Sequence, residues 1–255
     1  YDIWILDRGI YFGWADPDIV SDYLHEARAS SYQYAGSRSA FSDMSKEWIE
    51  DPGTLPCLSA RIVFRDVTRH ADSRTVRAAL IPPNRPVVHN SPALVWPEGD
   101  EIDEAYLLGI LSSMPLDWYS RRFVENHLTF GIFNNLPVPR PGRDDRLRQR
   151  VVNLSGRLAA VDDRYASWAD AVGVEYGSMD EEDKQQKIYE LDAVVAHLYG
   201  LTREHVEVIF NTFHDGWDHG KRLERVLDYY ESWGARLDLD HSEETAAEPP
   251  DSGER

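Results

Sequence analysis

The chain has almost no cysteine and no long hydrophobic run. Its 255 residues include one cysteine, Cys57, which excludes an internal disulfide and fits a reducing cytoplasm. No apolar stretch approaches the ~20 residues that a helix needs to cross a bilayer, and no signal peptide is recognisable. The hydrophobic content of 42% is typical of a folded protein rather than a disordered one. We therefore expect a cytoplasmic globular protein of one or two domains that does not enter membranes.

Lysine is scarce as well. Only four of the 27 basic residues are lysine and the rest are arginine, against 45 acidic residues and a net charge of −18. A high-salt cytoplasm would screen the self-repulsion of such a charge, and a GC-rich genome would also favour arginine codons. The composition leaves both explanations open.

Positive charge is concentrated in two segments of this acidic chain. Residues 61–85 hold six arginines and two aspartates, a local charge of +4, and residues 120–161 carry +5. The other segments are acidic, with −6 for 1–60, −6 for 86–119 and −15 for 162–255. Concentrated positive charge indicates an anionic partner, whereas a solvated hairpin face with no partner is the simpler alternative.

Hydrophobic periodicity predicts an α+β fold, in which a β-containing domain precedes a mainly helical extension. Residues 61–68 and 75–82 read as the two strands of a hairpin, because they are β-branched and flank a turn-prone segment. Helices are expected over 18–28 and 103–127, the latter interrupted at Pro115, and an apolar strand from Phe130 leads into a proline-rich connector. Beyond it, apolar stripes predict helices, with Gly200 ending one and Thr202 capping the next. The predicted units are a recognition domain (1–140), a helical domain (141–240) and a disordered acidic tail (241–255).

Motifs that would indicate metal or nuclease chemistry are weak. His214, Asp215, Asp218 and His219 form a dense polar cluster, but a glycine-broken loop is poorly suited to converging ligands, so we expect an interhelical turn and no metal. The segment 182–184 has the Glu-x-Lys end of a nuclease site without its strand. A nuclease function would therefore require metal-dependent cleavage of DNA by this segment alone.

Five segments in order resemble the C-terminal part of large adenine-specific DNA methylases, the type IIG restriction-modification enzymes and related phage-exclusion methylases. They are RIVFRDVT (61–68), ALIPPN (79–84), YLLGILSS (106–113), FNNLPVPRP (133–141) and ELDAVVAHLYGL (190–201). The resemblance covers most of residues 55–232. In that family a catalytic methylase domain precedes a target-recognition domain with a helical extension.

The resemblance implies recognition of double-stranded DNA rather than catalysis. The family binds S-adenosylmethionine at a Phe-x-Gly-x-Gly loop and positions adenine with an Asn/Asp-Pro-Pro-Tyr/Phe motif, and this chain has neither; Ile81-Pro-Pro-Asn lacks the frame around the prolines. We expect no catalytic residue, cofactor or metal site in this segment. The methylase, with its S-adenosylmethionine, is expected upstream in a longer polypeptide or on another subunit.

Arginine suits this role because its guanidinium makes paired hydrogen bonds to guanine and contacts phosphate oxygens. The candidate DNA contacts are arginines and nearby polar residues of the hairpin: Arg61, Arg65, Thr68, Arg69, Arg74, Arg77 and Asn84. For Arg61 and Arg65 a structural pairing with Asp66 or another carboxylate is the alternative. Arg121 and Arg122 are expected on a helix surface. At the level of the whole chain, the alternative is a protein-interaction or scaffold module of a defence complex that never reads bases.

Overall fold

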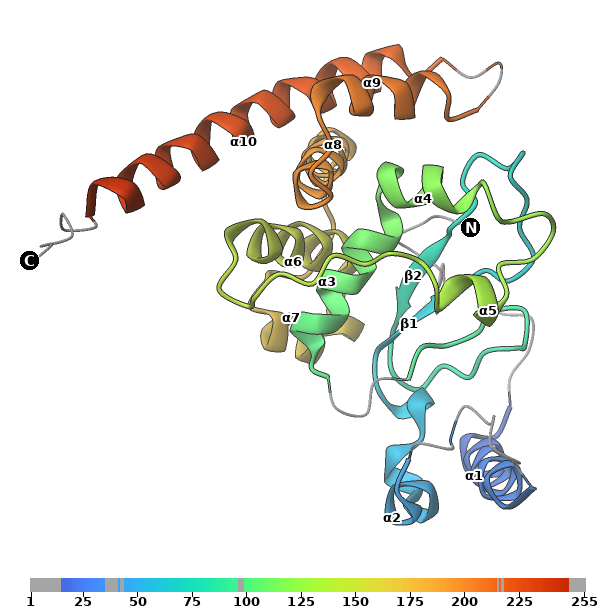
Figure 1. The fold of residues 1–255 in the computed structure, drawn as a ribbon. Coiled ribbons are helices and arrows are strands. Elements are labelled where there is room, and N and C mark those ends of the chain that lie inside the picture. The colour runs from blue at the N-terminus through green and yellow to red at the C-terminus, as the bar shows by residue number, and fades with distance from the viewer. Residues whose placement is uncertain are drawn as a thin grey trace, which may run out of the picture.

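The computed structural model describes residues 15–34, 41, 44–95, 99–214, 216 and 218–247, with the backbone alone for 33–34 and 240–247. A two-stranded antiparallel sheet is surrounded by helices (Figure 1), which confirms the α+β fold. Its strands are β1 (Arg61–Phe64) and β2 (Ala78–Ile81), and three 3-10 turns are η1 (Pro52–Thr54), η2 (Pro56–Leu58) and η3 (Asp163–Tyr165). The helices are α1 (Pro17–Tyr34), α2 (Lys46–Glu50), α3 (Glu101–Ser112), α4 (Met114–Ser120), α5 (Phe130–Phe133), α6 (Arg146–Ala159), α7 (Ala166–Val172), α8 (Glu181–Leu198), α9 (Arg203–Asn211) and α10 (Gly220–Ala247).

The hairpin pairs as predicted, from Arg61 opposite Ile81 to Phe64 opposite Ala78. Its strands are shorter than expected because other segments take their backbone groups. The amide of Asp66 donates to Asn90 and the amide of Thr68 donates to Asn126, so the chain leaves the sheet after Arg65. All eight strand residues are buried. The hairpin is therefore the centre of the fold rather than a presented surface.

One apolar core extends across the predicted boundary at residue 140. Leu80 of β2 and Leu108 of α3 belong to the same cluster as Val151 of α6 and Leu191 of α8. The hydroxyl of Tyr165 also donates to the carbonyl of Leu80, 3.1 Å away. The hairpin and the first helices of the extension thus share their hydrophobic stabilisation.

Several predicted helix boundaries are confirmed by their caps. Ser113 separates α3 from α4, and Pro115 lies in the first turn of α4, where its missing amide costs nothing. Gly200 adopts a left-handed φ of 63° after α8, and the side chain of Thr202 accepts from the amide of His205 to cap α9.

Three predictions about secondary structure were wrong. The helix expected over 103–127 ends at Ser120, and residues 121–127 are not helical. The apolar segment from Phe130 forms the short helix α5 instead of a strand, because the Thr129 side chain caps it by accepting from the amide of Ile132. The expected tail is helical up to Ala247 as the end of α10, and its remainder, 248–255, lies outside the described residues. In the part of the chain that the structure describes, no helix combines the length and apolar character needed to cross a membrane.

Gly109 allows α3 and α6 to approach closely. A Cβ atom at this position would lie 2.5 Å from Cγ1 of Val151, and the branched valine cannot rotate away cheaply. We expect Gly109→Ala to lower the free energy of unfolding by about 1–2 kcal/mol in urea titrations, since overpacking outweighs the gain in helix propensity. Val151→Ala should restore part of this loss. Gly131→Ala, whose Cβ would meet only Thr129 Oγ1 at 3.7 Å, is the matched control and should cost little.

Candidate nucleic-acid interface

The carboxylate of Asp117 holds the second half of the arginine-rich segment inside the protein. It is fully buried and accepts from the amides of Thr75 and Val76, at 3.0 and 3.1 Å. It also pairs with Nε of Arg74, whose Nη2 donates to the carbonyl of Ser112, 2.7 Å away. Arg74 is 8% exposed. Its predicted role as a DNA contact is therefore replaced by a structural one, because α4 supplies the anion that the guanidinium needs.

Arg61 and Thr68 also lie inside the protein. The guanidinium of Arg61 donates to the carbonyls of Arg85 and Ser59, at 2.6 and 3.3 Å, and burial lowers its pKa. The hydroxyl of Thr68, a residue without exposed surface, donates to the carbonyl of Thr75. Arg61 is only 5% exposed and Thr68 is not exposed at all, so both leave the set of candidate DNA contacts.

The remaining candidates lie nearer the surface and differ in their contacts. Arg65 is 3.4 Å from a carboxylate oxygen of Asp72, so it pairs with a carboxylate other than Asp66. Arg77 donates to the hydroxyl of Ser73 at 2.8 Å and is half-buried.

Arg69 and Asn84 are exposed at opposite ends of the hairpin. Asn84 follows β2 with a left-handed φ of 58°, and its amide donates to Cys57. Arg69 lies in the turn between the strands, and within the described residues its guanidinium makes no hydrogen bond or ion pair. Arg69 is thus the predicted contact whose charge is most available to an anionic partner.

The turn that carries Arg69 is held between the end of α4 and the end of α9. Arg121 Nη1 donates to the carbonyls of His70 and Phe213, at 2.6 and 3.0 Å, and its guanidinium lies 3.9 Å from the centre of the Phe213 ring. A ring nitrogen of His214 lies 2.7 Å from the carbonyl of Ala71. Arg121 therefore joins three segments that lie far apart in the sequence.

These segments enclose an open hollow of about 420 Å³, which we call the basic hollow. Of the described residues that line it, two are arginine, two are histidine and none is acidic: His70, Ala71, Trp118, Arg121, Arg122, Thr212, Phe213 and His214. The pKa of nearby His219 is lowered, first by burial and then by the charges of Arg222, Arg121 and Arg74. A concentration of positive charge thus persists here although the chain as a whole is strongly acidic.

Aromatic side chains lie on α4 and just after it, and Trp118 among them lines the hollow. The guanidinium of Arg122 lies 4.4 Å from the centre of the Trp118 ring, and the indole N–H of Trp118 donates to the hydroxyl of Thr212 at 2.9 Å. Next to them the rings of Tyr119 and Phe123 are 5.0 Å apart, and Phe123 is 54% exposed. Interleaved arginines and aromatic rings are suited to phosphates and to the faces of bases.

Sequence reasoning missed most of this surface. His70, Trp118 and His214 carry no local signal, because only tertiary contacts bring them to one place. The Arg121-Arg122 pair was predicted as a plain helix surface, whereas Arg121 is half-buried and connects the hairpin turn to the extension. The four-residue spacing of Trp118 and Arg122, which would place them on one face of the helix predicted over 103–127, was the usable clue.

No group of three or more potential metal ligands occurs among the described residues; Asp215, which belongs to the cluster noted in the sequence, lies outside them. Comparisons of the chain with protein-family models, with curated proteins and with solved structures found no match. Function is therefore inferred from this geometry and from the motif resemblance.

Proposed function

We propose that this chain is a DNA-binding target-recognition segment of an adenine-specific DNA methylase, of the restriction-modification or phage-defence kind, and that it contacts DNA through the basic hollow. The observation that carries the proposal is a hollow lined by Arg121, Arg122, His70 and His214, with no acidic residue among the described residues that line it, and with Arg69 next to His70 in the turn that forms one side. In a protein with a net charge of −18, such a surface favours a polyanion.

The roles of the arginines differ within this proposal. Arg69 and Arg122 are exposed and form no ion pair within the described part of the chain, so both can reach phosphates or base edges. Arg121 holds the turn in place, and its half-buried guanidinium adds positive charge to the hollow. Arg65 and Arg77 stand beside the turn and are secondary contacts.

The helical extension has the complementary role of holding the catalytic partner. In Figure 1, α10 runs from the body past α8 and projects beyond it. Leu239 on its projecting part is 65% exposed. A methylase domain or subunit that binds S-adenosylmethionine would pack against this helix. The same helix would serve a scaffold module, which is why DNA binding has to be tested directly.

The test removes the two exposed arginines together. We expect Arg69→Ala/Arg122→Ala to weaken binding to a fluorescein-labelled duplex at least about tenfold at about 100 mM salt, measured by anisotropy, because two phosphate contacts are lost. The slope of log affinity against log salt should become shallower by about 2.

The matched control is Arg140→Ala/Arg236→Ala. Arg140 is an exposed arginine without a contact in the described residues, like Arg69, and Arg236 lies 4.9 Å from the ring centre of Trp233, much as Arg122 lies over Trp118. The control removes the same charge and should keep most of the affinity. If both double variants weaken DNA binding equally, only the overall charge matters. If Arg69→Ala/Arg122→Ala leaves DNA binding unchanged, the proposed DNA-binding function is wrong and the scaffold function is favoured.

A further inference from the structure

Tyr119 and Phe123 form an exposed aromatic pair beside the basic hollow. Their ring centres are 5.0 Å apart, and Phe123 is 54% exposed and Tyr119 38% exposed. Neither ring belongs to the hydrophobic core clusters of the described residues, whereas the next residue, Val124, is buried in one of them. Two large apolar rings in contact at the surface indicate an interaction site more strongly than a single exposed ring does.

A tight turn after α4 keeps this pair next to the wall of the basic hollow. The amide of Arg122 donates to the carbonyl of Tyr119, and the amide of Phe123 donates to the carbonyl of Ser120, at 3.1 and 3.0 Å. The contact between Trp118 and Arg122 therefore lies alongside the contact between Tyr119 and Phe123. Trp118 and Arg122 line the hollow, so the aromatic pair borders it directly.

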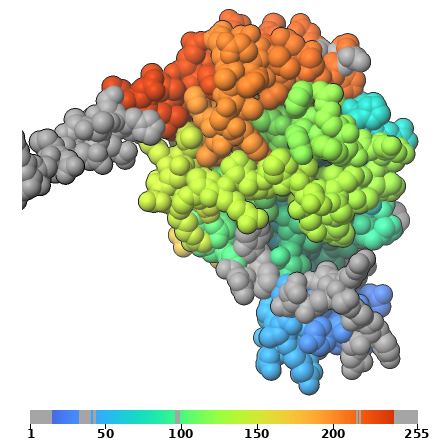
Figure 2. Space-filling model, viewed as in Figure 1, coloured from blue at the N-terminus to red at the C-terminus, as the bar shows by residue number. Residues whose placement is uncertain are grey.

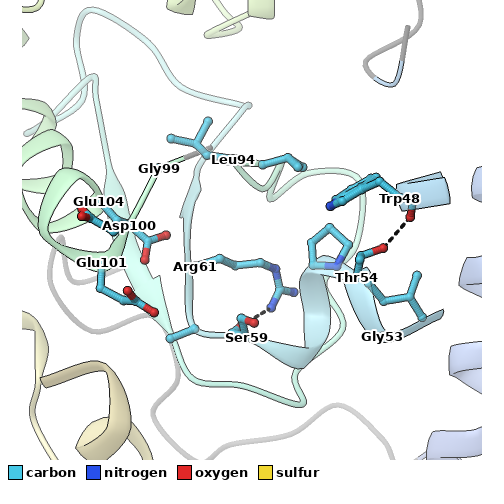
Figure 3. A pocket seen from close by; sticks show the side chains of 14 residues that line it. Trp48, Gly53, Thr54, Ser59, Arg61, Leu94, Gly99, Asp100, Glu101 and Glu104 are labelled. Atoms are coloured by element: carbon cyan, nitrogen blue, oxygen red, sulfur yellow. Dashed lines mark hydrogen bonds between the residues drawn. The ribbon is translucent and has the colours of Figure 1, made fainter. Parts of the chain in front are cut away.

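The charge around the pair favours an anionic partner. The described lining of the basic hollow holds two arginines, two histidines and no acidic residue. The hollow between η1, β1 and the start of α3 (Figure 3) has the reverse balance, with one arginine in its described lining and three acidic residues, Asp100, Glu101 and Glu104. A polyanion is thus attracted beside α4 and repelled at the other hollow. Exposed Glu125, two residues after Phe123, reduces this attraction without cancelling the two arginines.

An aromatic ring can stack on a DNA base only where that base has left the duplex. In a continuous duplex the bases stack on one another, and their faces are closed to a protein. An unpaired base exposes its face, and stacking on an aromatic side chain then raises affinity by about five- to 150-fold per base. Exposed rings beside arginines suit such a base together with its phosphates.

We propose that Tyr119 and Phe123 stack on an unpaired base of a DNA target whose phosphates lie at the basic hollow. The chain then binds DNA that contains an unpaired base more tightly than it binds a continuous duplex. Phe123 offers the more exposed ring, and Arg122, held over Trp118, contacts the adjacent phosphate. This inference rests on the proposed DNA binding and adds a preference that the arginines alone would not produce.

The experiment compares a continuous fluorescein-labelled duplex with the same duplex carrying a central bulge of unpaired thymidines, by anisotropy. We expect the bulged duplex to bind at least about fivefold more tightly at about 100 mM salt. Phe123→Ala should reduce this ratio of affinities to less than about twofold, because the stacking ring is lost. The salt slope should stay as in the wild type, since no charge is removed. Phe123→Trp, which keeps an aromatic ring, should retain the ratio.

Tyr176→Ala is the matched control, because Tyr176 is 50% exposed on the loop before α8, and it should keep the ratio. Unchanged far-ultraviolet circular dichroism shows that the variants are folded. The proposal is overturned if the wild type binds both duplexes equally, or if Phe123→Ala keeps the full ratio. Failure of the DNA-binding function itself has a different result, in which Arg69→Ala/Arg122→Ala leaves the affinity for the continuous duplex unchanged.

Discussion

Replacing Asp117 by alanine should destabilise the protein by about 3–5 kcal/mol, because it leaves Arg74 as a buried charge without its anion. The amides of Thr75 and Val76 lose their acceptor at the same time. Few single substitutions reach this size. Urea denaturation followed by circular dichroism measures the effect, and a loss below about 1 kcal/mol would contradict the role we give to this carboxylate.

Two further variants serve as controls for the Asp117→Ala measurement. Asp228→Ala removes an exposed aspartate that pairs with Arg225 at 3.6 Å, and it should cost less than about 1 kcal/mol. The double variant Arg74→Met/Asp117→Leu removes both charges and should recover part of the stability, as expected for a buried ion pair. It should not recover all of it, because the two amides remain unsatisfied.

The stability of the protein should also fall as the pH rises through the range in which Glu104 titrates. Burial raises the pKa of Glu104 from 4.5 to about 7, against the opposing hydrogen bonds from Trp168 and Ile62. Below pH 4.5 the folded and unfolded states are both protonated at this position. Between the two pKa values only the unfolded state loses its proton, so the contribution of Glu104 to the free energy of unfolding decreases, by about 3 kcal/mol in all, and this contribution no longer changes once the pH is well above 7.

This contribution can be isolated by comparing the wild type with Glu104→Gln across that pH range. The amide keeps an acceptor for Ile62 and has no charge, so the variant should lose the decline between pH 4.5 and 7. Burial opposes ionisation of Asp100, but hydrogen bonds from Arg143 and from backbone amides lower its pKa overall, and the hydrogen bond from Arg164 lowers the pKa of Asp162. Both groups act in the opposite direction to Glu104, and their contributions cancel in the difference. Glu101→Gln is the control and should keep most of the decline. Parallel curves for wild type and Glu104→Gln would show that the carboxylate is not titrating in this range.

The helical extension illustrates how well local signals predict local structure. Figure 2 shows its later helices, α8 to α10, as a continuous orange mass above the green surface of α4. Its boundaries at Gly200 and Thr202 follow from backbone and capping preferences that act within a few residues. Its packing partners did not follow, because the contact between Asp192 and the amide of Met114, at 2.8 Å, joins residues 78 positions apart.

The sequence by itself determined that this chain is an α+β protein with an antiparallel hairpin, and that its arginines are gathered in two segments. Hydrophobic period, turn residues and composition are local quantities, and they suffice for that. The tertiary structure alone decided which arginines are available. A guanidinium is satisfied equally by a buried carboxylate, by backbone carbonyls or by a phosphate, and nothing near Arg74 indicates that its partner lies 43 residues further on, at Asp117. Folding placed Arg61 and Arg74 inside, where carbonyls and a carboxylate take their charge, and left Arg69 exposed in the hairpin turn without such a partner among the described residues.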